Sequence, residues 1–215
     1  MGEVIAKIAD KSLKKQALYS MVEQNFSLVP LLLEGVSSQK PTVRYTCGSV
    51  LMELSAKYPQ KLYPYMDNFI ALLDSKHRIL CWNAIYTIAN LASVDTDQKF
   101  ETAFDKYYSL LGSGYMVTAA NLMGASGKIA VAKPQLANKI AEELLKVENL
   151  SVTPHLTEEC KLVIAEHAIE SLAQFFDKLA PQTQREVSRF VERQLGSPRL
   201  SLRKQAAAFV KKWKI

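Results

Sequence analysis

The strongest constraint on this chain is the stretch from Leu62 to Leu91, which has the pattern of two amphipathic helices joined by a short polar turn. Apolar residues recur every three or four positions in its first half, which predicts one wide apolar face: Tyr65, Met66, Phe69, Ile70, Leu72 and Leu73. The second half repeats the pattern with Leu80, Ala84, Ile88 and Leu91. Asp74-Ser75-Lys76 is short and polar, so we expect the two helices to be antiparallel. Because neither helix can bury its face alone, the chain must supply further units of the same kind.

The length and composition predict one folded domain over residues 1–215. Hydrophobic residues make up 48% of the chain and charged residues 22%, which allows a substantial core, and no linker-like segment divides the chain. No apolar run approaches the roughly 20 residues that a membrane span needs, and the N-terminus does not resemble a secretory signal. We therefore expect a cytoplasmic protein that has no membrane segment.

The cysteines indicate a reducing compartment. Cys47, Cys81 and Cys160 are odd in number, form no C-x-x-C pair and fall among helical apolar positions. This pattern favours buried, reduced thiols over disulfides.

The net charge of +6 is concentrated at the C-terminal end. Residues 185–215 hold nine Lys or Arg against two acids, whereas the preceding residues are nearly balanced. Such a stretch is either a solvated outer face or an electrostatic surface for an acidic partner.

The helical pair recurs along the whole chain. Leu13-Lys14-Lys15-Gln16-Ala17 returns almost unchanged as Leu202-Arg203-Lys204-Gln205-Ala206, and a small residue marks each predicted second helix: Ala17, Cys47, Ala84, Ala120, Ala168 and Ala206. These residues, which we call the anchors, lie 30, 37, 36, 48 and 38 residues apart, a period that fits two helices and two turns. We expect each anchor to face a neighbouring helix at close range. The predicted units are approximately 1–25, 26–57, 60–93, 97–131, 134–177 and 181–215.

Three local signals complete this organisation. Pro30 and Pro64 are expected in the first turn of their helices, where a missing N–H does no harm. Val4 to Ile8 is long enough only for a partial first helix. The connection from Val147 to Thr157 accounts for the 48-residue interval and is either a functional insertion or a solvated detour.

The pattern resembles the HEAT repeat, an armadillo-like α-solenoid family. The likeness lies in Leu28-Val29-Pro30, Pro41-Thr42-Val43-Arg44 and Leu51-Met52-Glu53-Leu54, and Ser197 to Trp213 looks like a terminal unit. It implies an all-α fold, a right-handed α-α superhelix of about six helix pairs. Cys81, Val117 and Ala165 stand where the family's second helices tend to carry arginine, so no continuous row of arginines is expected.

The sequence contains no catalytic constellation, and we predict no cofactor or metal. Gly124-Ala125-Ser126-Gly127-Lys128 lacks the residues that a phosphate-binding loop requires on either side. His77 and Cys81 have the spacing of two metal ligands on a helix, but two ligands do not make a site.

A candidate partner-binding surface lies on the second helices. The resemblance places some of their residues in a concave groove, and we select six: Tyr19, Tyr45, Trp82, Asn83, Tyr86 and His167. Tyr and Trp anchor protein interfaces and also stack on nucleic-acid bases. The alternative is that these aromatic side chains pack between the two helical layers.

These observations leave two function classes. The first is a non-enzymatic scaffold that presents a concave helical face to a protein or peptide. The second is a nucleic-acid-binding protein, because a HEAT-like family of alkylpurine DNA glycosylases is similar in size and repeats. A glycosylase-like enzyme is a further alternative within this class, but that family requires an acidic residue on the inner helices and no aspartate falls on the predicted second helices. A nucleic-acid partner requires a shared basic surface, for which the candidates are Lys14, Lys15, Arg44, Arg203 and Lys204.

Overall fold

The computed structural model describes residues 2–215, and in this range the regular structure is entirely helical, with one isolated bridge between Thr153 and Leu156. The α-helices are α1 (Gly2–Ala9), α2 (Lys15–Gln24), α3 (Val29–Gly35), α4 (Pro41–Lys57), α5 (Pro59–Leu62), α6 (Met66–Leu72), α7 (Arg78–Leu91), α8 (Lys99–Ser109), α9 (Met116–Ala132), α10 (Ala137–Leu145), α11 (Glu158–Leu172), α12 (Pro181–Gln194) and α13 (Leu200–Trp213). Short 3-10 helices cover Phe26–Leu28, Tyr63–Tyr65, Ala92–Val94, Leu110–Ser113, Pro134–Leu136, Lys146–Asn149 and Phe176–Lys178.

The contacts divide the chain into two compact units. Unit 1 ends at Phe104 and unit 2 is Asp105–Ile215, so the boundary falls inside α8.

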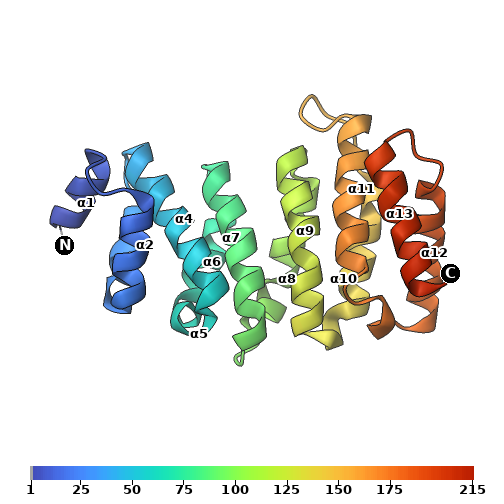
Figure 1. Cartoon of the computed structure of the whole chain (residues 1–215), viewed down its shortest axis with the longest axis horizontal. Coiled ribbons are helices and arrows are strands. Elements are labelled where there is room, and N and C mark those ends of the chain that lie inside the picture. Colours follow the sequence, from blue (N-terminus) through green and yellow to red (C-terminus); the bar gives the residue numbers. More distant parts are fainter. Residues whose placement is uncertain (1) are drawn as a thin grey trace. The chain divides into compact units, whose positions relative to one another are not determined.

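In unit 1, α4 and α7 lie side by side as the second helices of two successive pairs, while α3 and α6 are their partners in the other layer (Figure 1). Gly48 permits the close approach of α4 and α7, because a Cβ atom there would stand 2.7 Å from Leu80 Cδ2. Gly35 does the same for α3 and α4, where a Cβ atom would stand 2.5 Å from Cys47 Sγ. The pairs are therefore held by tight interhelical packing.

In unit 2, α11 packs against both α9 and α13 (Figure 1). Three buried hydroxyl groups add hydrogen bonds within unit 2. Ser171 Oγ on α11 donates to the carbonyl oxygen of Met123 on α9 at 2.5 Å. The Tyr108 hydroxyl donates to Ser126 Oγ at 3.0 Å, and Ser126 Oγ in turn donates to the Leu122 carbonyl at 2.7 Å. The polar groups buried here thus have partners, as a stable core requires.

The local signals in the sequence are largely confirmed. The first segment forms the single short helix α1, and Pro30 lies in the first turn of α3. The helix expected from Leu62 is interrupted, however, because a 3-10 turn containing Pro64 separates α5 from α6. Proline has no N–H to donate to the α-helical ladder, so the regular helix begins again only at Met66.

The predicted packing of the first anchor is wrong. Ala17 is exposed, and α2 instead buries Leu18 and Val22. The other five anchors, Cys47, Ala84, Ala120, Ala168 and Ala206, are buried as expected. Leu13–Ala17 and Leu202–Ala206 are therefore alike in sequence, but their helices do not bury the same positions of this motif.

The long connection after α10 is a structured cap on α9. Thr153 and Leu156 pair in a tight antiparallel bridge, and Thr153 Oγ1 donates to the Gly114 carbonyl at 2.7 Å. Gly114 adopts a left-handed conformation with φ of 75°, which glycine reaches without steric cost. The His155 carbonyl accepts from the Met116 N–H at the start of α9. This segment thus satisfies backbone groups at a helix end.

No helix in residues 2–215 is both long and apolar enough to cross a membrane.

Candidate functional site

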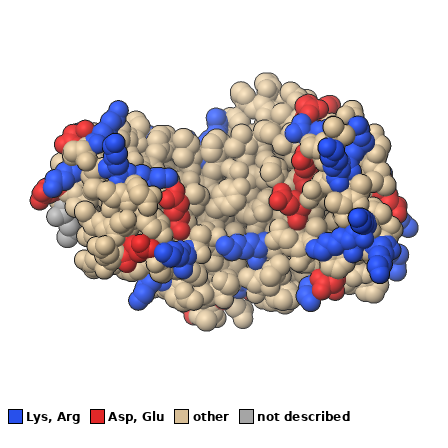
Figure 2. Space-filling model, viewed as in Figure 1, with Lys and Arg blue, Asp and Glu red and all other residues tan. Residues whose placement is uncertain are grey.

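The residues selected from the sequence are brought together best on α4 and α7 of unit 1. Tyr45 lies on α4, and Trp82, Asn83 and Tyr86 lie on α7; we call this set the α4–α7 face. Tyr45, Trp82 and Asn83 are half-buried, and Tyr86 is 37% exposed. Figure 2 shows that the molecule is mostly uncharged over α7 in this view, in keeping with a helix whose one charged residue is Arg78. The face therefore presents partly exposed aromatic side chains to solvent.

The spacing along each helix explains this exposure. Residues 82, 83 and 86 of α7 share one side of the helix, while Leu80, Ala84 and Ile88 point into the core. The aromatic residues of the face are therefore neither fully solvated nor packed entirely between the layers.

Local contacts hold two members of the face. The ring of Tyr45 meets the ring of His77 edge-to-face at 6.3 Å, and the Arg44 guanidinium carbon lies 4.9 Å from the Tyr45 ring centroid. Asn83 packs against Gly48, where its Nδ2 atom is buried with no hydrogen-bond partner. Tyr45 and Asn83 are thus fixed by packing before any partner arrives.

Tyr19 belongs to a different cluster. It is half-buried on α2, and its pKa is raised by burial and, to a smaller extent, by the charge of Glu23. Glu23 accepts hydrogen bonds from Lys57 Nζ at 2.7 Å and from the Tyr58 hydroxyl at 2.6 Å. These bonds lower the pKa of Glu23. Tyr19 therefore neighbours a polar network at the ends of α2 and α4.

His167 lies in unit 2, on α11. It is half-buried, and its Nδ1 atom stands 3.8 Å from Glu170 Oε2. It belongs to unit 2, whereas the α4–α7 face belongs to unit 1.

The five candidate basic residues have different environments. Lys14 and Lys204 are exposed, and Lys15 forms an ion pair with Glu53 at 2.7 Å. Arg44 is buried and donates to the Ser38 carbonyl, and Arg203 makes the same contact with the Ser197 carbonyl. Arg44 and Arg203 therefore each bind a backbone carbonyl in the turn before their helix.

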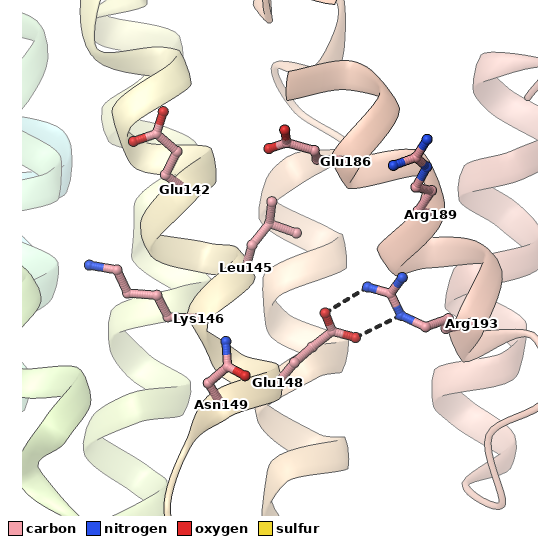
Figure 3. Close-up of a pocket in the computed structure, with 8 residues that line it drawn as sticks. All are labelled: Glu142, Leu145, Lys146, Glu148, Asn149, Glu186, Arg189 and Arg193. Atoms are coloured by element: carbon pink, nitrogen blue, oxygen red, sulfur yellow. Dashed lines mark hydrogen bonds and ion pairs between the residues drawn. The ribbon is translucent and has the colours of Figure 1, made fainter. Parts of the chain in front are cut away.

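Unit 2 has a shallow pocket that is lined by both acidic and basic residues (Figure 3). It has a volume of about 410 Å³ between α10 and α12. Arg193 binds Glu148 through two parallel bonds of 2.9 and 2.6 Å, and Arg189 lies one turn away on α12. Arg193 of α12 thus pairs with an acid of the 3-10 helix that follows α10, which charge counting alone did not predict.

Among residues 2–215, no group of three or more His, Cys, Asp and Glu is arranged to hold a metal ion.

No protein-family model matches the sequence, and no curated protein matches it significantly. Solved structures do match. The designed armadillo repeat protein YIII(Dq)4CqI has a TM-score of 0.59 at 17% identity over 97% of this chain and 91% of its own. The designed armadillo repeat protein YIII(Dq.V1)4CPAF, in complex with the peptide (KR)4, has a TM-score of 0.60 at 16% identity over 98% and 91%. An engineered protein has a TM-score of 0.55 at 18% identity over 98% and 87%.

These likenesses establish the fold. The chain has an all-α helical-repeat solenoid fold like that of the designed armadillo repeat proteins.

Proposed function

We propose that this protein is a non-enzymatic scaffold that binds a protein or peptide on the α4–α7 face. The observation that carries the proposal is the exposure of Tyr86 one turn after half-buried Trp82 on α7, which packs against α4, the helix that bears half-buried Tyr45. Tyr and Trp dominate the binding energy of many interfaces, because they bury large areas and lose little rotamer freedom.

Two further points support this surface. Ile79 is 42% exposed one turn before Trp82 and Asn83, and it extends the apolar area toward the start of α7. Helical-repeat folds in general present an extended surface, which suits a chain-like partner. A designed armadillo neighbour was solved with a bound peptide, so folds of this class accept such ligands.

The proposal is tested with a peptide selected for binding. A random peptide display library is panned against the purified full chain, and an enriched peptide is synthesised with a fluorescent label. Anisotropy then compares the wild type with Tyr86→Ala and Trp82→Ala. We expect each variant to weaken binding by about tenfold or more, as for a residue at the centre of an interface.

Val131→Ala is the matched control. Val131 is 55% exposed on α9 of unit 2, so the change removes exposed apolar area from a second helix outside the α4–α7 face. An equal loss in this variant, or a library that yields no binder, contradicts the proposal.

Labelled duplex and single-stranded oligonucleotides form a second arm, measured at roughly 50 and 200 mM salt. Submicromolar binding at low salt that collapses at the higher salt concentration would replace the scaffold proposal with the nucleic-acid class.

We also propose that residues 1–215 fold as one domain in the cytoplasm. The cysteines support the compartment, because all three are free thiols and Cys47 and Cys81 are buried.

A further inference from the structure

A second surface of unit 1 has the composition of an anion site. A cavity of about 310 Å³ lies between the turn before α4 and the turn before α7. We call it the turn pocket, and the lining residues that matter are Ser38, Arg44, Asp74, Ser75, Lys76 and His77.

Arg44 is a buried cation without a counter-ion. Only 7% of its surface is exposed, and its Nη1 atom donates to the Ser38 carbonyl at 2.8 Å. Its Nε atom is buried with no hydrogen-bond partner. Within residues 2–215, no carboxylate forms an ion pair with this guanidinium. The contacts of this guanidinium are the neutral Ser38 carbonyl and the ring of Tyr45, and a buried charge gains from a negative partner within hydrogen-bond reach.

The other lining residues add positive charge and donors. Lys76 is exposed at the rim, and its ammonium has three donors. The pKa of His77 is lowered by burial and then by the charges of Arg44 and Lys76, which indicates a positive potential in the pocket. α7 begins directly after His77, and the positive end of its macrodipole acts in the same direction. Asp74 is the acid in the lining and offsets part of this charge.

Two serine hydroxyl groups are arranged to donate. Ser38 Oγ accepts the Lys40 N–H at 3.2 Å, and Ser75 Oγ accepts the His77 N–H at 3.2 Å. Both serines line the turn pocket, and a serine hydroxyl that accepts one hydrogen bond can also donate its O–H to an anion oxygen.

We propose that the turn pocket binds a phosphate-type oxyanion, with the buried Arg44 supplying the charge and Lys76 and the serine hydroxyls contacting the oxygens. The ligand is either free phosphate or a phosphoryl group on an amino-acid side chain. This inference does not rest on the proposed function, because the turn pocket uses none of the α4–α7 face.

The test is a titration of the purified full chain with sodium phosphate, against sodium chloride at equal ionic strength. Calorimetry gives the dissociation constant, and the His77 ring resonances in NMR report the site. We expect saturable binding of phosphate, a rise in the pKa of His77 as phosphate binds, and no such effect of chloride. An unsaturated titration, or equal effects of the two salts, overturns the proposal.

Variants locate the site. Lys76→Gln changes an exposed residue, so the fold is expected to survive, and we expect about tenfold weaker phosphate binding from the loss of one charge-assisted contact. Arg203→Gln is the matched control, because Arg203 makes the same type of backbone contact in unit 2 and is expected to leave binding unchanged. Equal affinity of Lys76→Gln and wild type would overturn the assignment.

A titration with O-phosphoserine distinguishes the two possible ligands, free phosphate and a phosphorylated amino-acid side chain. Tighter binding of O-phosphoserine than of phosphate assigns the pocket to a phosphorylated side chain, and the reverse assigns it to free phosphate.

Discussion

Arg44 Nη1 donates a hydrogen bond of 2.8 Å to the carbonyl oxygen of Ser38, six residues earlier in the chain. Arg203 and Ser197 repeat this relationship at 2.6 Å in unit 2. In both places an arginine in the first turn of a second helix donates a hydrogen bond to a backbone carbonyl in the turn that precedes the helix. The two repeated units therefore share this hydrogen bond as well as their pattern of apolar residues.

Replacing Arg44 by lysine tests this contact. Lysine keeps the charge but has no planar fork to reach the Ser38 carbonyl from a buried position. We expect the free energy of unfolding to fall by about 1–2 kcal/mol, as for the loss of a hydrogen bond by a buried charged group. Urea denaturation measures the change. Arg203→Lys should lose less, because Arg203 is only half-buried; a larger loss there would contradict the reasoning.

The anchors supply a second prediction. Ala84 and Ala168 are 1% and 0% exposed, so Ala84→Phe or Ala168→Phe should overpack a helix contact and lower the free energy of unfolding by roughly 1–3 kcal/mol. Ala17→Phe is the control, because Ala17 is exposed and a larger side chain there meets solvent. Urea denaturation of the three variants decides the point: wild-type stability in either buried variant would show that the anchor does not face its neighbour.

The sequence predicts the fold class because each helix buries a stripe of apolar residues at helical spacing. It fails at α2, where Leu13 is half-buried and Ala17 is exposed although the matching residues Leu202 and Ala206 are buried. Solvated lysines constrain no contact, so they do not fix the register of a helix. The buried residues Leu18 and Val22 carry that information.

The candidate sites were predictable only in part. The aromatic residues of α7 could be placed on one side from periodicity alone, and the structure brings Tyr45 near them through the packing of α4 on α7. The sequence predicts only that Arg44 is a candidate for a basic surface. Its hydrogen bond to the Ser38 carbonyl could not be predicted, because no pattern of side chains indicates a backbone acceptor. The turn pocket forms where two turns meet in space, although Ser38 and Ser75 are about 37 residues apart in the chain. The sequence alone does not indicate that these turns lie together.

The thiols should differ in reactivity at pH 8. Burial raises the pKa of Cys47 to about 12 and that of Cys81 to about 11, so both remain protonated and shielded in the folded chain. Cys160 is only half-buried. We expect a thiol-specific reagent to label Cys160 first, and to label the other two only as the chain unfolds. Mass spectrometry of timed digests measures the order, and early labelling of Cys47 would contradict the burial argument.

The same pKa shifts predict a pH dependence of stability. A raised pKa in the folded state means that the unfolded chain loses its thiol protons first, above its ordinary value of 9.0. The stabilisation is thus complete below pH 9 and declines as the pH rises toward 11 and 12. Each thiol contributes a slope of about 1.4 kcal/mol per pH unit. Cys47→Ala should show a shallower decline than the wild type between pH 9 and 11 in urea denaturation; an unchanged slope would remove Cys47 as a cause.

The two tryptophans can decide whether residues 1–215 unfold as one domain. Trp82 lies in unit 1, and Trp213 lies in unit 2 with its ring 5.3 Å from that of Phe176. Trp213→Phe leaves a reporter of unit 1 alone, and Trp82→Phe leaves a reporter of unit 2 alone. In each variant, urea unfolding is followed by tryptophan fluorescence and by far-ultraviolet circular dichroism, which reports all helices. For one domain we expect the two curves to coincide in both variants, because a cooperative transition gives every probe the same midpoint. A fluorescence midpoint that departs from the circular dichroism curve in either variant would mean that the two units unfold independently.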